Sequence, residues 1–143
     1  MSAPQEDIQT AQQDIIDSFQ FFDDWMDRYQ YIIDLGGELP EFPESGMVDA
    51  NKVEGCQSQV WLVSTVEGDR LHFRATSDAA IVRGLIALLL RLYSGRTPRE
   101  IVDTPPDFIQ AIGLDQHLSP NRGNGLRAMI ERMKAEAREH LSG

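Results

Sequence analysis

The chain carries a single cysteine, and the residues beside it raise the first question about chemistry. Cys56 stands in the segment VEGCQSQVWLV, where its neighbours are Gly55, Gln57, Ser58 and Gln59. A cysteine thiolate can attack carbon or accept sulfur, whereas a lone cysteine is more often a small buried apolar residue. Gly55 allows a tight turn or a positive φ, and the three polar residues suit a core poorly. We therefore expect Cys56 on a loop that presents it as a reactive group.

Little in the local sequence would activate this thiol. The carboxylate of Glu54 disfavours a neighbouring thiolate, and Lys52 is the only cation close by. A distant base or a partner would have to help. His117, in LDQHLSP with Asp115 nearby, is the best candidate for such a base, so a Cys56–His117 hydrolase or thiol transferase stays open. A surface or helix-capping role is the simpler interpretation of this histidine.

Metal and nucleotide chemistry are not indicated by the motifs. One cysteine and three scattered histidines provide no ligand pair at the spacing of a zinc site, and an iron–sulfur cluster would need several cysteines. The chain also lacks a phosphate-binding loop and a dinucleotide fingerprint. We therefore expect no metal and no cofactor in this chain.

The charge of the chain limits its partners. Thirteen basic and 23 acidic residues give a net charge of −10. This sign does not suit a broad surface for nucleic acid or anionic lipid, so we expect neither as a partner. Solubility is the simplest interpretation of the charge, and an acidic face that meets a basic partner is the alternative.

Two helices are predicted before the cysteine segment. Apolar residues recur at helical spacing in IQTAQQDIIDSF, at Ile8, Ala11, Ile15 and Phe19. The segment FDDWMDRYQYIIDLG continues the pattern, ends at Gly36-Gly37, and has a stripe that we expect in the core, formed by Phe22, Trp25, Met26, Tyr29, Ile32 and Ile33. The breakers in ELPEFPESGMVDANKV then predict a loop with a short strand near its end.

Beyond Cys56 the hydrophobic period changes to two. SQVWLVSTV and RLHFRAT flank the turn EGD, which predicts an antiparallel hairpin with one face more apolar than the other. On the first strand, one face carries Val60, Leu62 and Val66 and the other carries Trp61, Val63 and Thr65. On the second strand, Leu71, Phe73 and Ala75 alternate with His72, Arg74 and Thr76.

The rest of the chain is predicted to be helical. Ser77 or Asp78 would cap a helix from Ala79 to about Tyr93, and TPRE forms a capping box that begins at Thr97. A short helix near PDFIQAIGL precedes a long one whose apolar stripe is Leu126, Met129, Ile130, Met133 and Leu141. The order of elements predicts an α+β fold, a small antiparallel sheet with helices packed against it, in one domain over residues 1–143.

No targeting segment is recognisable. The start MSAPQEDIQTAQQD lacks the basic and apolar regions of a secretory signal. The most apolar helix, AAIVRGLIALLLRLY, contains two arginines and is too short to cross a bilayer. We expect a cytoplasmic protein without a membrane partner.

Four segments, in order, resemble the SufE family of sulfur acceptors. They are RYQYIIDLGGELP, GCQSQVWL, SDAAIVRGLIALLLRLYSGRTPREIV and LDQHLSPNRGNGLRAMI, and the resemblance runs from about Asp24 to Ala137. It implies a SufE/IscU-like fold. It also implies that Cys56 accepts sulfane sulfur as a persulfide from a PLP-dependent cysteine desulfurase, stimulates that enzyme, and passes the sulfur to an iron–sulfur cluster assembly scaffold.

The resemblance further implies a carrier and activator that is not independently catalytic. The pyridoxal phosphate would belong to the partner, a SufS- or CsdA-like desulfurase, and the receiving scaffold would be a SufBCD-like complex. The sequence does not separate the SufE type from the CsdE type, and a homodimer stays open. An adaptor that only docks on the desulfurase is a further alternative.

The resemblance and the local sequence together suggest roles for residues around Cys56. Gly55 would be a hinge of the loop, and Gln59 a residue that holds the loop backbone. Asp78 would first cap a helix and second steer the loop or a partner, while Arg122 is either a structural cation or part of a docking face. The complete set of assigned loop and docking residues is Gly55, Gln57, Ser58, Gln59, Asp78, His117 and Arg122.

Overall fold

A computed structural model describes residues 7–55 and 58–141 of the chain. Within these ranges the chain forms seven α-helices and one two-stranded antiparallel sheet, which confirms the predicted α+β class. The elements are α1 (Ile8–Phe19), α2 (Trp25–Gly36), two 3-10 turns (Glu44–Gly46 and Asp49–Asn51), β1 (Val60–Glu67), β2 (Arg70–Ser77), α3 (Ala80–Tyr93), α4 (Pro98–Asp103), α5 (Phe108–Ala111), α6 (Leu114–His117) and α7 (Pro120–Leu141).

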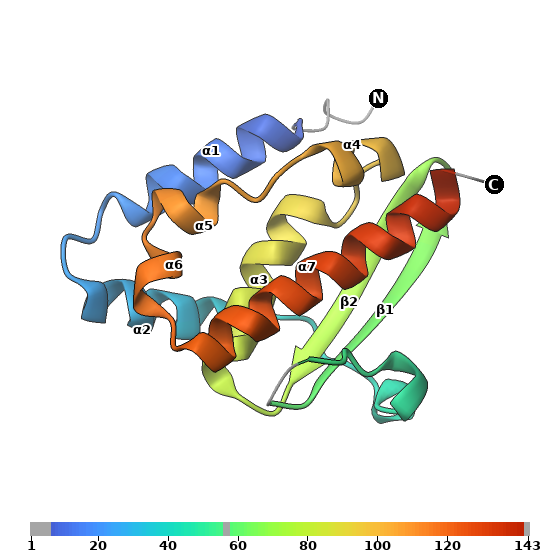
Figure 1. Ribbon diagram of the computed structural model, residues 1–143, viewed down its shortest axis with the longest axis horizontal. Helices are drawn as coiled ribbons and strands as arrows, with labels where there is room; N and C mark the ends of the chain where they lie inside the picture. Colours follow the sequence, from blue (N-terminus) through green and yellow to red (C-terminus); the bar gives the residue numbers. More distant parts are fainter. Residues whose placement is uncertain (1–6, 56–57, 142–143) are drawn as a thin grey trace.

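Helix α3 is the centre of the structure. Figure 1 shows it between α1 and α2 on one side and the hairpin on the other, with α7 running across it. Nine of its 14 residues are buried, as expected for a helix that is apolar on most of its circumference. Among the described residues, no helix combines the length and the apolar character that a membrane span requires.

The first helix follows its predicted stripe. Asp7 accepts a hydrogen bond from the backbone N–H of Thr10 at 2.8 Å and so caps α1. The four stripe residues predicted for this helix are all buried, namely Ile8, Ala11, Ile15 and Phe19. Burial of this stripe fixes α1 on the core.

The second helix follows its predicted stripe only in part. Ile32 is buried and Trp25 and Tyr29 are half-buried, but Met26 is 77% exposed, so its predicted place in the core is wrong. The face of α2 that packs is the one that carries Trp25 and Tyr29, and Met26 lies beyond its edge in the first turn.

Helices α2 and α3 cross in backbone contact. A Cβ added to Gly84 would lie 2.1 Å from the carbonyl oxygen of Ile32, and one added to Gly36 would lie 2.6 Å from the backbone nitrogen of Gly84. These distances leave no room for a side chain on either helix at the crossing point. The two glycines therefore set how closely α2 approaches the centre of the fold.

The hairpin has the predicted strands and turn. Its register runs from the pair Val60–Ser77 to the pair Glu67–Arg70, and Gly68 in the turn has φ +63°. The buried side chains of the sheet are Val60, Leu62, Leu71, Phe73, Ala75 and Ser77. The short strand predicted before Cys56 is only a bridge between Lys52 and Trp61, in which Val53 donates its N–H to the carbonyl of Val60 at 2.9 Å.

The helices after the sheet correct two predictions. Helix α3 begins without a side-chain cap. Ser77 Oγ accepts a hydrogen bond from the N–H of Ala79, which precedes the helix, and the Asp78 carboxylate accepts one from the N–H of Gln59, just before β1. The capping box at Thr97 is present as predicted. In α7 the stripe is buried up to Met133, whereas Leu141 is 39% exposed in the last turn. Ala137 is the last buried residue of that face.

Candidate functional site

Cys56 and Gln57 lie outside the described residues, so the site is built from the chain on both sides of them. Gly55 has φ +91°, one of the conformations that glycine allows, and a Cβ at this position would meet the Cβ of Ala128 on α7 at 3.3 Å. Three residues earlier, the carbonyl of Lys52 accepts a hydrogen bond from Arg132 of α7 at 3.2 Å. Helix α7 therefore contacts the residues that directly precede Cys56.

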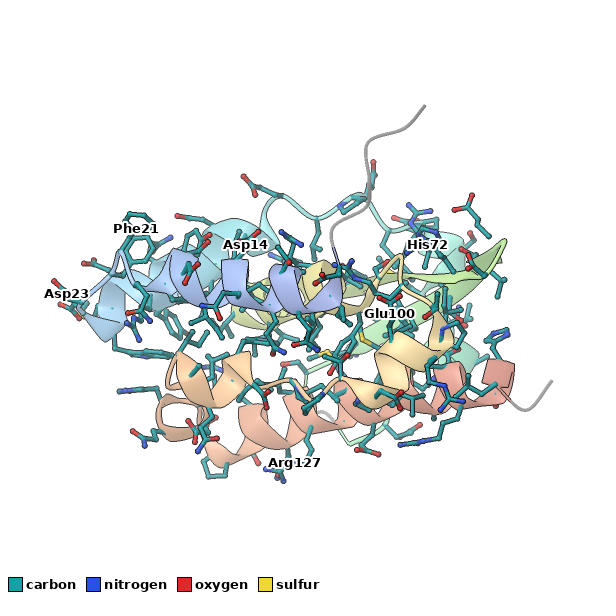
Figure 2. The ribbon with its side chains drawn as sticks, turned by 90° about the horizontal axis from the view of Figure 1, so that it is seen from above. Asp14, Phe21, Asp23, His72, Glu100 and Arg127 are labelled. Carbon is teal, nitrogen blue, oxygen red and sulfur yellow. The ribbon has the colours of Figure 1, made fainter. Side chains whose placement is uncertain are left out.

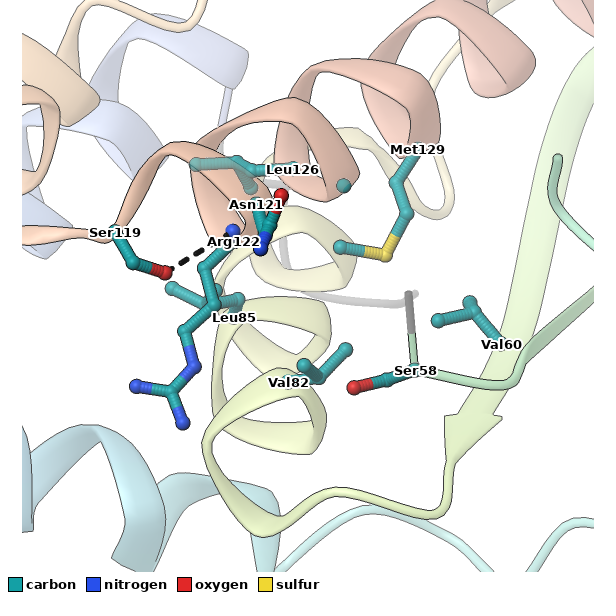
Figure 3. A pocket seen from close by; sticks show the side chains of 10 residues that line it. Ser58, Val60, Val82, Leu85, Ser119, Asn121, Arg122, Leu126 and Met129 are labelled. Atoms are coloured by element: carbon teal, nitrogen blue, oxygen red, sulfur yellow. Dashed lines mark hydrogen bonds between the residues drawn. The ribbon is translucent and has the colours of Figure 1, made fainter. Parts of the chain in front are cut away.

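The outgoing side of the segment borders a pocket of about 400 Å³ (Figure 3). Ser58 forms part of its wall, and the first half of α3 and the first turns of α7 supply most of the rest. The lining residues are Ser58, Val60, Val82, Leu85, Ser119, Asn121, Arg122, Gly125, Leu126 and Met129. The pocket combines apolar walls with a guanidinium group at one side, directly beside the segment that carries the only cysteine.

Asp78 connects the end of the hairpin to the outgoing side of the cysteine segment. Its Oδ1 accepts a hydrogen bond from the backbone N–H of Gln59 at 3.1 Å, and its own N–H donates to the carbonyl of Gln59 at 3.3 Å. This reciprocal pair continues the ladder beyond Val60 and Ser77. The contacts of Gln59 with other described residues run through its backbone, so a role for its side chain stays a prediction.

Arg122 lies at the corner where α7 begins. Ser119 Oγ accepts a hydrogen bond from the N–H of Arg122 at 3.3 Å, and the Arg122 guanidinium donates to the hydroxyl of Tyr29 at 3.2 Å. The same side chain forms a wall of the pocket. Arg122 thus makes a structural contact with α2 and has an exposed position at the pocket, while a part in docking stays a prediction.

His117 lies at the end of α6, outside the lining of the pocket. Its ring stacks on Trp25 of α2 at a centroid distance of 4.2 Å and an angle of 14°. The structure therefore brings Ser58 and Arg122 into one pocket and places His117 in an aromatic contact outside the lining of that pocket. The predicted Cys56–His117 pair is not tested, because Cys56 lies outside the described residues.

Apart from Arg122, the pocket residues at the start of α7 and along it were not predicted as site residues from the sequence. Leu126 and Met129 were predicted only as core, and Ser119 and Asn121 were not singled out. A signal for Ser119 was available, because a serine directly before Pro120 is typical of a helix start. Nothing in a single sequence indicates that this start adjoins the cysteine segment.

The far half of α7 is held by Lys134. Its ammonium group donates to the carbonyls of Ile101, Val102 and Thr104 at 2.9, 3.1 and 2.9 Å, which satisfies the C-terminal end of α4. Burial lowers the pKa of Lys134, and the charge of Arg138 acts in the same direction. The ammonium also lies 5.4 Å from the ring centroid of Tyr93. This clamp positions the helix that forms the wall of the site.

Residues 13–137 match the family described as SufE, the Fe-S metabolism associated domain. This match takes in most of α1, all of α2, the hairpin and most of α7. The chain belongs to the SufE family. The membership predicted from four sequence motifs is confirmed, and it relates the chain to iron–sulfur metabolism.

This SufE-family chain is similar to proteins that carry SufE-like names. An uncharacterized SufE-like protein of Rhizobium meliloti is 50% identical over 137 residues, which cover 92% of this chain and 98% of that protein. One from Rhizobium etli is 48% identical over 129 residues, 87% of each protein. One from Synechocystis is 40% identical over 123 residues, which cover 86% of this chain and 77% of that protein.

The SufE-family fold is also found in a solved structure. The solution structure of a hypothetical protein from Thermus thermophilus superposes with a TM-score of 0.76 at 24% sequence identity. The superposition covers 93% of this chain and 97% of that chain. At this identity the similarity concerns the fold alone. The roles of the individual site residues in this SufE-family chain therefore remain predictions.

Proposed function

We propose that this chain is a sulfur carrier, in which Cys56 takes sulfane sulfur from a PLP-dependent cysteine desulfurase and delivers it to an iron–sulfur cluster assembly scaffold. The observation that carries the proposal is the setting of the described residues on both sides of the lone cysteine. Before it, Gly55 lies against Ala128 of α7, and after it, Ser58 lines a pocket of about 400 Å³. The relation of the family to iron–sulfur metabolism supports the same function.

The transfer needs only one thiol on this chain. The Cys56 thiolate attacks the terminal sulfur of the persulfide on the desulfurase cysteine. A new S–S bond forms on Cys56, the S–S bond on the desulfurase breaks, and the desulfurase cysteine leaves as a thiolate. The exchange is balanced without an external oxidant or reductant. It also frees the desulfurase for another turnover, so the carrier would stimulate that enzyme without being an enzyme itself.

The pocket supplies what a stored persulfide requires. A persulfide is reversible and is lost to cellular thiols, so a carrier gains from a place that excludes them. The walls formed by Val82, Leu85 and Leu126 are apolar, and Arg122 offers a positive charge for a sulfur anion. We propose that the Cys56 sulfur rests against this pocket and turns outward on docking, with Gly55 as the hinge. The partners would be a SufS- or CsdA-like desulfurase and a SufBCD-like scaffold in the cytoplasm.

The test is an intact-mass spectrum of the chain after incubation with a cysteine desulfurase and free cysteine, without reductant. The expected result is a mass gain of one or more sulfur atoms that reduction removes and that Cys56→Ser lacks. Omission of free cysteine is the control for adventitious oxidation.

Two outcomes would contradict the carrier. If Cys56→Ser stimulates the desulfurase as well as the unchanged chain, the protein is an adaptor that only docks. If no sulfur is gained and the activity of the chain on a thioester or thiol substrate is lost in His117→Ala, the Cys56–His117 hydrolase or transferase is correct.

A further inference from the structure

A second depression lies away from the cysteine segment, between α1, the end of α2 and the second half of α3. Its volume is about 770 Å³. It shares no lining residue with the pocket beside Ser58. We call it the α1–α3 groove; its apolar lining residues are Ile15, Phe19, Phe21, Tyr31, Leu35, Leu39, Pro40, Phe73, Ala87, Leu88 and Leu90.

Phe21 stands at the edge of this groove with 86% of its surface exposed. The two phenylalanines nearest to it in sequence are packed, because Phe19 and Phe22 both contact the ring of Tyr31, at centroid distances of 5.2 and 5.0 Å. Figure 2 shows the Phe21 ring standing away from the ribbon, on the side of the molecule opposite Arg127 of α7. A single exposed apolar residue is ordinary, but an exposed aromatic ring at the edge of an apolar groove has the arrangement of an interface anchor.

The charge around the groove is one-sided. Asp14, Asp17 and Glu38 line it, against one arginine, Arg91, which pairs with Asp14 at 3.5 Å. The asymmetry extends through the adjoining elements. Residues 7–54 carry 12 acidic and 2 basic side chains, whereas residues 55–141 carry 10 acidic and 11 basic ones. The net negative charge of the molecule is therefore concentrated in α1, α2 and the loop that follows them.

We propose that the α1–α3 groove binds an amphipathic helix of a partner protein, with Lys or Arg side chains beside its apolar face. The walls are mainly helical, which suits a helix laid into a groove. The apolar face of that helix would cover Phe21 and enter the groove, while its cations meet Asp17 and Glu38. A second copy of this chain would bring the same acidic elements to the groove, so charge disfavours it.

The groove would serve a different purpose from the cysteine site. Because the two depressions share no lining residue, a helix in the groove leaves the wall beside Ser58 free. One partner could be held at α1 and α3 while another engages the cysteine segment. The inference does not depend on sulfur transfer, since it rests on Phe21, the groove and the charge.

The test is an NMR titration of the ¹⁵N-labelled full chain with a synthetic helical peptide of Leu, Lys and Arg. The matched control peptide has Glu in place of each Lys and Arg. We expect saturable shifts of the amides of Phe21, Leu39 and Leu88 with the basic peptide, and none with the acidic one. Phe21→Ala should weaken binding about tenfold or more, and Asp17→Asn should weaken it less and reduce its salt dependence. Val66→Ala, a change of a 52% exposed apolar residue on β1, should leave affinity unchanged.

Several results would overturn the proposal. These are shifts that map to α7 instead of the groove, equal affinity of Phe21→Ala, or equal binding of the acidic peptide. Self-association at high concentration that Phe21→Ala abolishes would instead assign the groove to a second copy of the chain. Phe21→Ala should still gain sulfur in the intact-mass experiment, so failure of the groove and failure of the carrier are distinguishable.

Discussion

Asp78 is the residue that ties the cysteine segment to the sheet. It bonds the N–H and the carbonyl of Gln59, three residues after Cys56. We expect Asp78→Ala to speed hydrogen exchange at the amide of Gln59, because its acceptor is removed, at a cost in folding free energy of about 1 kcal/mol. Asp78→Asn keeps an oxygen acceptor and should exchange more slowly than Asp78→Ala. Equal exchange in all three proteins would show that the bond does not order the segment.

A substitution at Gly55, the residue before Cys56, tests whether this glycine is a hinge of the loop. At φ +91° an alanine is strained by about 1–2 kcal/mol, and its Cβ would also press on Ala128. We expect Gly55→Ala to slow sulfur loading several-fold, as measured by mass spectrometry over time. Gly68→Ala is the matched control, because Gly68 also has a positive φ, +63°, but lies in the open hairpin turn. Equal loading rates of Gly55→Ala and Gly68→Ala would contradict a hinge at Gly55.

Buried Tyr93 should make stability depend on alkaline pH. Burial, with the nearby Asp107 carboxylate, raises the pKa of Tyr93 above its ordinary value. The unfolded chain loses this proton near pH 10 while the folded chain keeps it, so stability falls as the pH rises above about 10. We expect Tyr93→Phe to reduce that fall, measured from urea midpoints at about pH 9 and pH 11.

A measurement at neutral pH is the control for this prediction. Tyr93 donates to the carbonyl of Thr104 at 2.8 Å, and that carbonyl keeps its bond from Lys134 in the variant. The loss near pH 7 should therefore be only about 1 kcal/mol. An unchanged slope between the two alkaline conditions would contradict the assigned cause.

At the scale of elements, the crossing of α2 and α3 leaves no space for a side chain at Gly36 or Gly84. Gly84→Ala would place a methyl group against the carbonyl of Ile32, where no flexible side chain can move aside. We expect a loss of about 3 kcal/mol or more in unfolding free energy, measured by chemical denaturation. Gly123→Ala is the control, since a Cβ there meets nothing within 4 Å and alanine favours α7 by about 0.5–1 kcal/mol. Similar effects of both changes would refute the close crossing.

The elements could be predicted from the sequence because each has a clear local signal. The capping box at Thr97 and the change of hydrophobic period beyond Cys56 mark boundaries that the structure reproduces. The errors lie near the ends of elements. Met26 and Leu141 fit their helical stripes but fall where the neighbouring element no longer covers the stripe. Periodicity gives the face of a helix, not the extent of what packs on it.

Little of the candidate site could be predicted from the sequence. Local residue types single out Gly55 and Cys56; Gly55 has a positive φ, which its residue type allows, and the role of Cys56 stays a prediction. The bond of Asp78 to Gln59, the contact of Arg122 with Tyr29 and the stack of His117 on Trp25 join residues far apart in sequence. Such contacts depend on how helices meet, which a single sequence without relatives does not encode locally.

At the scale of the whole molecule, the charge is uneven. Residues 7–36, which include α1 and α2, carry seven acidic and one basic side chain, whereas acidic and basic residues nearly balance over residues 55–141. Figure 1 shows α1 and α2 on the side of α3 away from the hairpin, while the loop after α2 returns to the start of β1. The strongly acidic side of the molecule is therefore the one formed by α1 and α2.

The uneven charge also has a consequence for kinetics. A molecule with its negative charge on one side has a large dipole moment, so a basic partner feels a torque as well as an attraction before contact. Most encounters should then begin with the α1–α2 side facing the partner. Random collisions would rarely have that orientation. The association rate with a cationic partner should fall steeply as ionic strength rises, while the dissociation rate should change little. Stopped-flow measurements at several salt concentrations would separate these two rates.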